Sequence, residues 1–81
     1  MDTNKIIQDI LNELERAEKK YPQWPVDQIH AAAVVAEEAG EFIRAVNQEK
    51  WDRRNPKASN IEAIQTAAMC VRFLKNRACI S

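Results

Sequence analysis

A chain of 81 residues, 46% hydrophobic and 30% charged, has the composition of one small globular domain and not of a disordered segment. Twelve basic residues balance twelve acidic ones, so a zero net charge argues against a protein that binds nucleic acid polymers through a basic surface. No apolar run is long enough to span a membrane, and the N-terminus lacks an apolar signal region. We therefore expect a single cytoplasmic domain over residues 1–81.

The first predicted element is an amphipathic helix that ends before Pro22. Asp2 or Thr3 can cap its start, and Lys19 and Lys20 suit the negative end of the helix dipole. Its apolar side chains recur every three or four residues, the spacing of one buried stripe: Ile6, Ile7, Ile10, Leu11, Leu14 and Ala17.

The second predicted helix runs from about Pro25, a good first helical residue, to about Glu49. Gly40 in its interior predicts either a close helix crossing or room for a ligand, because glycine otherwise weakens a helix. We expect this helix to be largely buried, with a neighbouring backbone close to its small side chains: Ala31, Ala32, Ala33, Ala36, Ala39 and Ala45.

The third predicted helix has Asn55 as its cap and Pro56 as its first residue, and it extends to about Ala78. Its predicted apolar stripe is Ile64, Ala67, Val71, Leu74 and Ala78. Three helices in so short a chain bury a modest core, and apolar surface remains. We therefore predict an all-α fold that assembles as a homodimer or homotetramer around a helical bundle.

Three glutamates of the second helix, Glu37, Glu38 and Glu41, project from one arc of about 100°. Arg44 is the only basic residue within a turn of them, and oxygen ligands without basic partners suit Mg²⁺. The alternative is a solvated acidic face. The apolar residues around the cluster argue against it, because carboxylates in a buried helix need a partner.

Glu62 and Gln65 of the third helix share a face and could complete an oxygen-rich site opposite the first cluster. The alternative is a capping box, in which Glu62 bonds back to the backbone of Ser59. Glu62 is free for a metal only if the helix begins earlier, near Pro56. Local signals leave both interpretations open.

This arrangement resembles the signature of MazG-type nucleotide pyrophosphohydrolases, which is Glu-Glu-x-x-Glu followed some twenty residues later by Glu-x-x-Asp. The resemblance covers about residues 24–75, and the chain looks like the compact branch that is often associated with phages or mobile elements, but Gln65 stands where the family usually has Asp. It implies Mg²⁺-dependent, or Mn²⁺-dependent, hydrolysis of a ribo- or deoxyribonucleoside triphosphate to the monophosphate and pyrophosphate. It also implies that Glu37 assists a metal or the attacking water, and that four residues hold the metal: Glu38, Glu41, Glu62 and Gln65.

Other residues are candidates for substrate binding. His30 lies on the same side of its helix as Glu37 and could contact a base or a phosphate, or simply be packed. Trp24 and Trp51 could stack on a base or serve as apolar anchors. The basic residues after the second helix could attract a triphosphate or form a solvated loop: Lys50, Arg53, Arg54 and Lys57.

Two other functions remain open on the sequence alone. One is a nucleotide- or metal-binding module without turnover, for which the neutral Gln65 is the relevant feature. The other is a structural helical oligomer, in which the glutamates pair with the basic loop of a neighbouring subunit. Metal binding separates the structural protein from the other two, and product formation separates the enzyme from the binding module.

Overall fold

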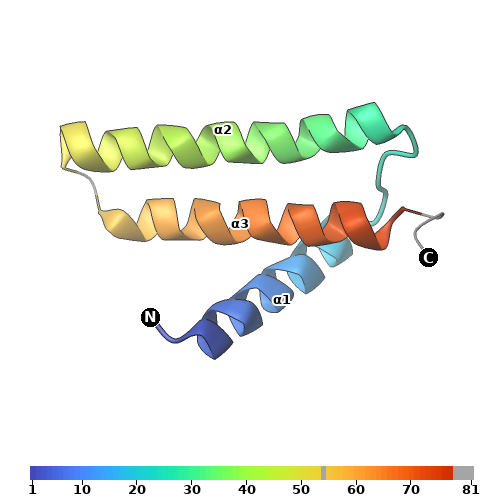
Figure 1. The fold of residues 1–81 in the computed structure, drawn as a ribbon, viewed down its shortest axis with the longest axis horizontal. Helices are drawn as coiled ribbons and strands as arrows, with labels where there is room; N and C mark the ends of the chain where they lie inside the picture. The colour runs from blue at the N-terminus through green and yellow to red at the C-terminus, as the bar shows by residue number, and fades with distance from the viewer. Residues whose placement is uncertain (54, 78–81) are drawn as a thin grey trace.

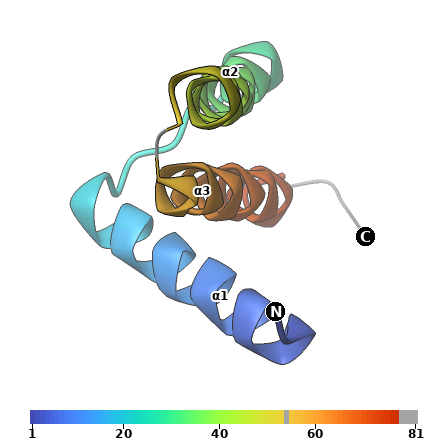
Figure 2. The ribbon, with the colours of Figure 1, turned by 90° about the vertical axis from the view of Figure 1, so that its left-hand side faces the viewer.

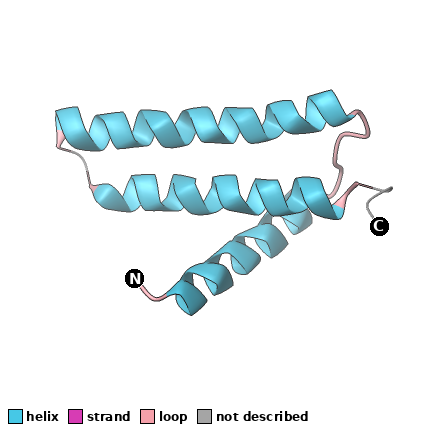
Figure 3. Cartoon of the chain, viewed as in Figure 1, coloured by secondary structure: helices cyan, strands magenta, loops and turns pink. Residues whose placement is uncertain are grey.

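The computed structural model describes residues 1–53 and 55–77, which form three α-helices and, within these ranges, no strand. The helices are α1 (Thr3–Lys20), α2 (Gln28–Asp52) and α3 (Pro56–Lys75). Helices α2 and α3 run antiparallel, and α1 crosses α3 obliquely (Figure 1). The end view places α3 between α2 and α1 (Figure 2), and helix accounts for nearly all of the described chain (Figure 3). The predicted all-α class is confirmed.

Helix α1 has the predicted ends. The Asp2 carboxylate accepts a hydrogen bond from the Asn4 backbone N–H at 3.1 Å, and the Tyr21 N–H donates to the Ala17 carbonyl at 2.8 Å. The predicted stripe is only partly buried: Leu14 and Ala17 belong to the core, whereas Ile7 and Leu11 remain exposed. The oblique crossing accounts for this difference, because the two helices diverge toward the N-terminus of α1 (Figure 1).

Helix α2 begins at Gln28, three residues later than predicted, and ends at Asp52. Its cap is Asp27, whose carboxylate accepts a hydrogen bond from the His30 backbone N–H at 3.2 Å. Pro25 therefore lies in the loop, because a residue with a side-chain acceptor stands two positions further along. Arg53 terminates the helix in the left-handed conformation, with φ of 54°.

The expectation that α2 is largely buried is wrong, because most of the helix is exposed in the single chain. Ala31 is its one fully buried residue, and Ile29 and Ile43 are 81% and 61% exposed. The predicted close crossing at Gly40 is also absent, since no atom of another described helix lies within 4 Å of the position that a Cβ would take. Only the side of α2 that faces α3 is covered, because α1 lies beyond α3.

Helix α3 begins as predicted, with Asn55 accepting a hydrogen bond from the Lys57 N–H at 2.9 Å and Pro56 in the first turn. It ends at Lys75, and Ala78, the predicted end, lies outside the described residues. The predicted stripe was wrong in part. Leu74 is 58% exposed, and the buried apolar residues of α3 are Ala68 and Met69. The middle helix is covered on two sides, so a one-sided stripe does not describe it.

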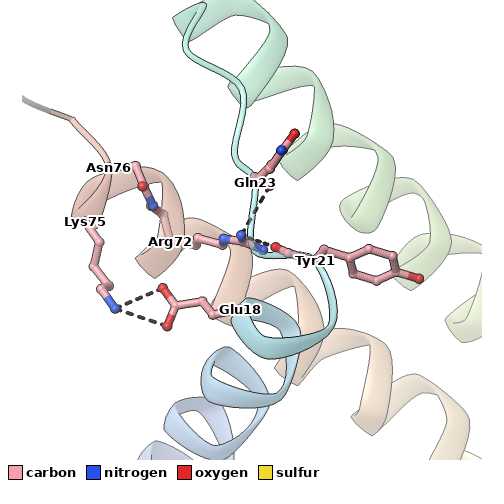
Figure 4. Close-up of polar contacts among 6 residues, drawn as sticks. All are labelled: Glu18, Tyr21, Gln23, Arg72, Lys75 and Asn76. Carbon is pink, nitrogen blue, oxygen red and sulfur yellow. Dashed lines mark hydrogen bonds and ion pairs between the residues drawn. The ribbon is translucent and has the colours of Figure 1, made fainter.

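Arg72 ties the loop between α1 and α2 to α3 (Figure 4). Its side chain is 4% exposed, and Nη2 donates hydrogen bonds to the carbonyls of Tyr21 and Gln23. The guanidinium carbon lies 4.9 Å from the centroid of the Trp24 ring. These contacts fix the path by which the chain leaves α1 and enters α2.

None of the described helices has the length and apolar character needed to cross a membrane.

Candidate metal centre

Three carboxylates from two helices converge at the interface of α2 and α3. Glu38 and Glu41 are three residues apart on α2 and so share one face, and Glu62 approaches them from α3. One oxygen from each of the three lies within 4.8 Å of the oxygens of the others. Antiparallel packing thus joins residues that are more than twenty positions apart in the sequence.

The capping-box alternative for Glu62 is excluded by the start of α3. Because the helix begins at Pro56, Ser59 lies inside it, and the Ser59 hydroxyl hydrogen-bonds to the carboxylate of Glu49. The same hydroxyl lies 2.9 Å from the Pro56 carbonyl oxygen. The Glu62 carboxylate is therefore free to face α2.

The carboxylate cluster lacks compensating partners. The Oε2 atoms of Glu38 and Glu62 are buried and accept no hydrogen bond from the described residues. Burial raises the pKa of Glu38, and the charges of Glu41 and Glu62 raise it further. Burial also raises the pKa of Glu62, with a second contribution from Glu41. Buried oxygens without a donor, in a set made only of oxygens, fit a hard cation such as Mg²⁺ or Mn²⁺.

Glu38 and Glu41 open onto a cleft of about 400 Å³ that all three helices line. Gln65 of α3 also lines it, so an amide side chain borders the same cleft as Glu38 and Glu41. Basic and aromatic residues line the rest of the cleft, among them Arg16, Lys20, Trp24 and Arg72. The cleft therefore has an acidic wall, formed by Glu38 and Glu41 of α2, and a basic wall, formed by Arg16 and Lys20 of α1.

The other predicted residues on α2 lie outside the cluster. Glu37 is exposed, and its charge makes the smallest of the contributions that raise the pKa of Glu38. His30 is exposed in the first turn of α2 and is not among the residues that line the cleft. Its backbone N–H is used by the Asp27 cap, two helical turns from the cluster.

The two tryptophans have different places. Trp24 lines the cleft, whereas Trp51 lies near the far end of α2, beside a shallow depression that also includes Gly40 and Ile43. The ammonium of Lys50 lies 4.9 Å from the Trp51 ring centroid. Lys50, Arg53 and Lys57 do not line the cleft, and Arg54 lies outside the described residues.

Sequence reasoning missed the residues that α1 and the end of α3 contribute. Glu13, Arg16 and Lys20 are spaced by three and four, so they share a face with the buried Ala17. Arg72 stands seven residues after Gln65, two turns along the same side of α3. This spacing was visible in the sequence, but the crossing of α1 over α3 was not.

Comparison of the chain with protein-family models, with curated proteins and with solved structures gave no match. The basis for a functional assignment is therefore the chemistry of the described side chains.

Replacing Glu38 by Gln should stabilise the protein at neutral pH when divalent cations are chelated. A carboxyl whose pKa rises on folding favours the folded state below its ordinary pKa of about 4.3, and this contribution is lost as the pH rises through the raised value. Above that range, the Glu38→Gln variant should therefore have the larger free energy of unfolding. Urea unfolding at a series of pH values measures the difference.

Glu37→Gln is the matched control, because it removes the neighbouring but exposed carboxylate. It should leave the pH dependence close to that of the wild type. Parallel curves for wild type and Glu38→Gln would contradict the prediction.

Proposed function

We propose that the protein is a Mg²⁺-dependent pyrophosphohydrolase that converts a nucleoside triphosphate to the monophosphate and pyrophosphate. The observation that carries the proposal is the convergence of Glu38, Glu41 and Glu62, two of which have buried oxygens without partners. The similarity of their spacing to the MazG-type signature supports the same activity. A cleft of about 400 Å³ beside the carboxylates is within the range of small-ligand sites.

Each residue has a definite part in this proposal. Glu38, Glu41 and Glu62, with the amide oxygen of Gln65, would hold Mg²⁺. A bound Mg²⁺ supplies positive charge that stabilises the phosphates and makes a water molecule more acidic. Exposed Glu37 would assist a metal or accept a proton from the attacking water, and the face of Trp24 is available for a base.

A binding module without turnover is the second candidate. Gln65 favours it, because a neutral amide lines the cleft where the MazG-type signature has a carboxylate. An amide oxygen can ligate Mg²⁺ but removes one negative charge from the site. Product formation separates the two candidates.

The purified protein, given Mg²⁺ or Mn²⁺ and a panel of ribo- and deoxyribonucleoside triphosphates, should form monophosphate and pyrophosphate. Glu41→Gln should lower this rate by about 100-fold or more, because it removes a proposed metal ligand. Chromatographic analysis of the products measures the rate and names the preferred base and sugar.

Glu15→Gln is the control for that experiment, since Glu15 is exposed on α1 and pairs with Lys19. If Mg²⁺ binds but no nucleotide gives a product, the enzyme is excluded and the binding module without turnover remains. Absence of Mg²⁺ binding would leave a structural protein.

Gln65→Glu should tighten Mg²⁺ binding several-fold, because it adds a carboxylate of the same length beside Glu38 and Glu41. It should also lower the stability of the metal-free protein by like-charge repulsion. Isothermal titration with Mg²⁺, together with thermal unfolding in a chelator, measures both effects. Unchanged Mg²⁺ affinity would remove Gln65 from the proposed ligand set.

We also propose that the exposed apolar side of α2 is covered by another copy of the chain, in a homodimer or homotetramer. Exposed Ile29, Ile43 and Val46 on this helix support the proposal. Light scattering should give a whole multiple of the chain mass, and Ile43→Lys should shift it toward the monomer because a charge would be buried. A monomeric wild type would refute the assembly.

A further inference from the structure

Helix α1 forms the basic wall of the cleft, opposite the acidic one. Glu13, Arg16 and Lys20 all line the cleft from this helix, and Glu38 and Glu41 line it from α2. The hydrogen bond to Glu13 raises the pKa of Arg16, and the charge of Glu38 contributes to the same shift. Burial raises the pKa of Glu38, with a lesser contribution from the charge of Glu13. The two walls therefore lie within electrostatic range.

Arg16 holds a carboxylate in the geometry that it would use for a phosphate. Its Nε donates to one Glu13 oxygen at 2.9 Å, and its Nη2 donates to the other at 2.6 Å. A guanidinium fork binds phosphate oxygens in the same two-pronged manner. The Arg16 side chain is 52% exposed, so this pair is open to exchange with an anion from solution.

Lys20 stands one turn further along the same face. Among the ion pairs between described residues none involves Lys20, whereas the adjacent Lys19 pairs with Glu15 at 3.1 Å. Its ammonium lies 5.4 Å from the centroid of the Tyr21 ring. Lys20 is thus a cation at the cleft without a carboxylate to neutralise it.

We propose that Arg16 and Lys20 bind phosphate groups of a polyphosphate that spans the cleft, and that Glu13 is an internal competitor which the phosphate displaces from Arg16. The inference rests on the proposed function, because a metal held by the opposite wall would bind the same polyphosphate. A ligand with several linked phosphates suits the site, since its charges can engage both the metal and the two cations.

Calorimetric titration with inorganic tripolyphosphate, with and without Mg²⁺, tests the proposal on the full chain. Arg16→Gln and Lys20→Gln should each weaken binding about tenfold, because each removes a charge-assisted contact. Glu13→Gln should tighten binding, because it frees Arg16 and removes a negative charge. Lys19→Gln is the matched control and should leave binding unchanged.

The opposite effects of Glu13→Gln and Arg16→Gln separate this role from a structural one. Both variants break the same ion pair. If the role of the pair were purely structural, both substitutions would lower the thermal stability by a similar amount and change tripolyphosphate binding in the same direction. Equal weakening by Lys19→Gln and Lys20→Gln, or a wild type that does not bind tripolyphosphate, would overturn the proposal.

The two proposals fail in different measurements. Titration with Mg²⁺ alone tests the carboxylate wall, and its failure would overturn the proposed metal-dependent function. Tripolyphosphate binding without Mg²⁺ tests the α1 residues by themselves. Loss of binding in Arg16→Gln under those conditions would support the α1 site even if no metal binds.

Discussion

The buried guanidinium of Arg72 is the interaction on which the arrangement of the helices depends. A charge removed from water is costly unless it is hydrogen-bonded, and here the acceptors are the carbonyls of Tyr21 and Gln23 in the loop. The face of Trp24 covers the same group. This side chain of α3 holds the loop at the point where the chain passes from α1, on one side of α3, to α2 on the other (Figure 2). The cleft lies where these three elements meet.

The charges within this cleft are not evenly compensated. Arg16 is engaged by Glu13 on α1, so it is not the partner of the carboxylates across the cleft. Glu38 and Glu62 thus keep buried oxygens to which no described residue donates a hydrogen bond, and burial raises the pKa of both. A small domain has little stability to spare, so an uncompensated cluster of this kind favours the binding of a cation. In the proposed function, the acidic and basic walls would then bind different parts of one ligand.

Local signals predicted most of the fold. The caps Asp2 and Asn55 act on neighbouring backbone N–H groups, so the sequence around them is sufficient to locate the starts of α1 and α3. The start of α2 was misplaced because two signals competed, and the acceptor side chain of Asp27 prevailed over Pro25. Burial was harder to predict. Leu74 fits the helical periodicity of α3 and is exposed, whereas Met69 lies outside the predicted stripe and is buried. Only the order of the packed helices accounts for this difference.

The residues of the site also fall into two groups: those that the local sequence predicts and those that depend on how the helices pack. Glu38 and Glu41 follow from the helical repeat, and Glu62 follows once the start of α3 is known. The basic wall could not be predicted in this way, because it depends on the crossing of α1 over α3. The sequence of one helix alone does not determine that crossing. Arg16 and Lys20 stand beside the buried Ala17, at the border between the apolar and polar sides of α1. Charged residues at such a border are solvated in an isolated helix and line a cleft when a second helix crosses there, so their chemistry is decided by packing.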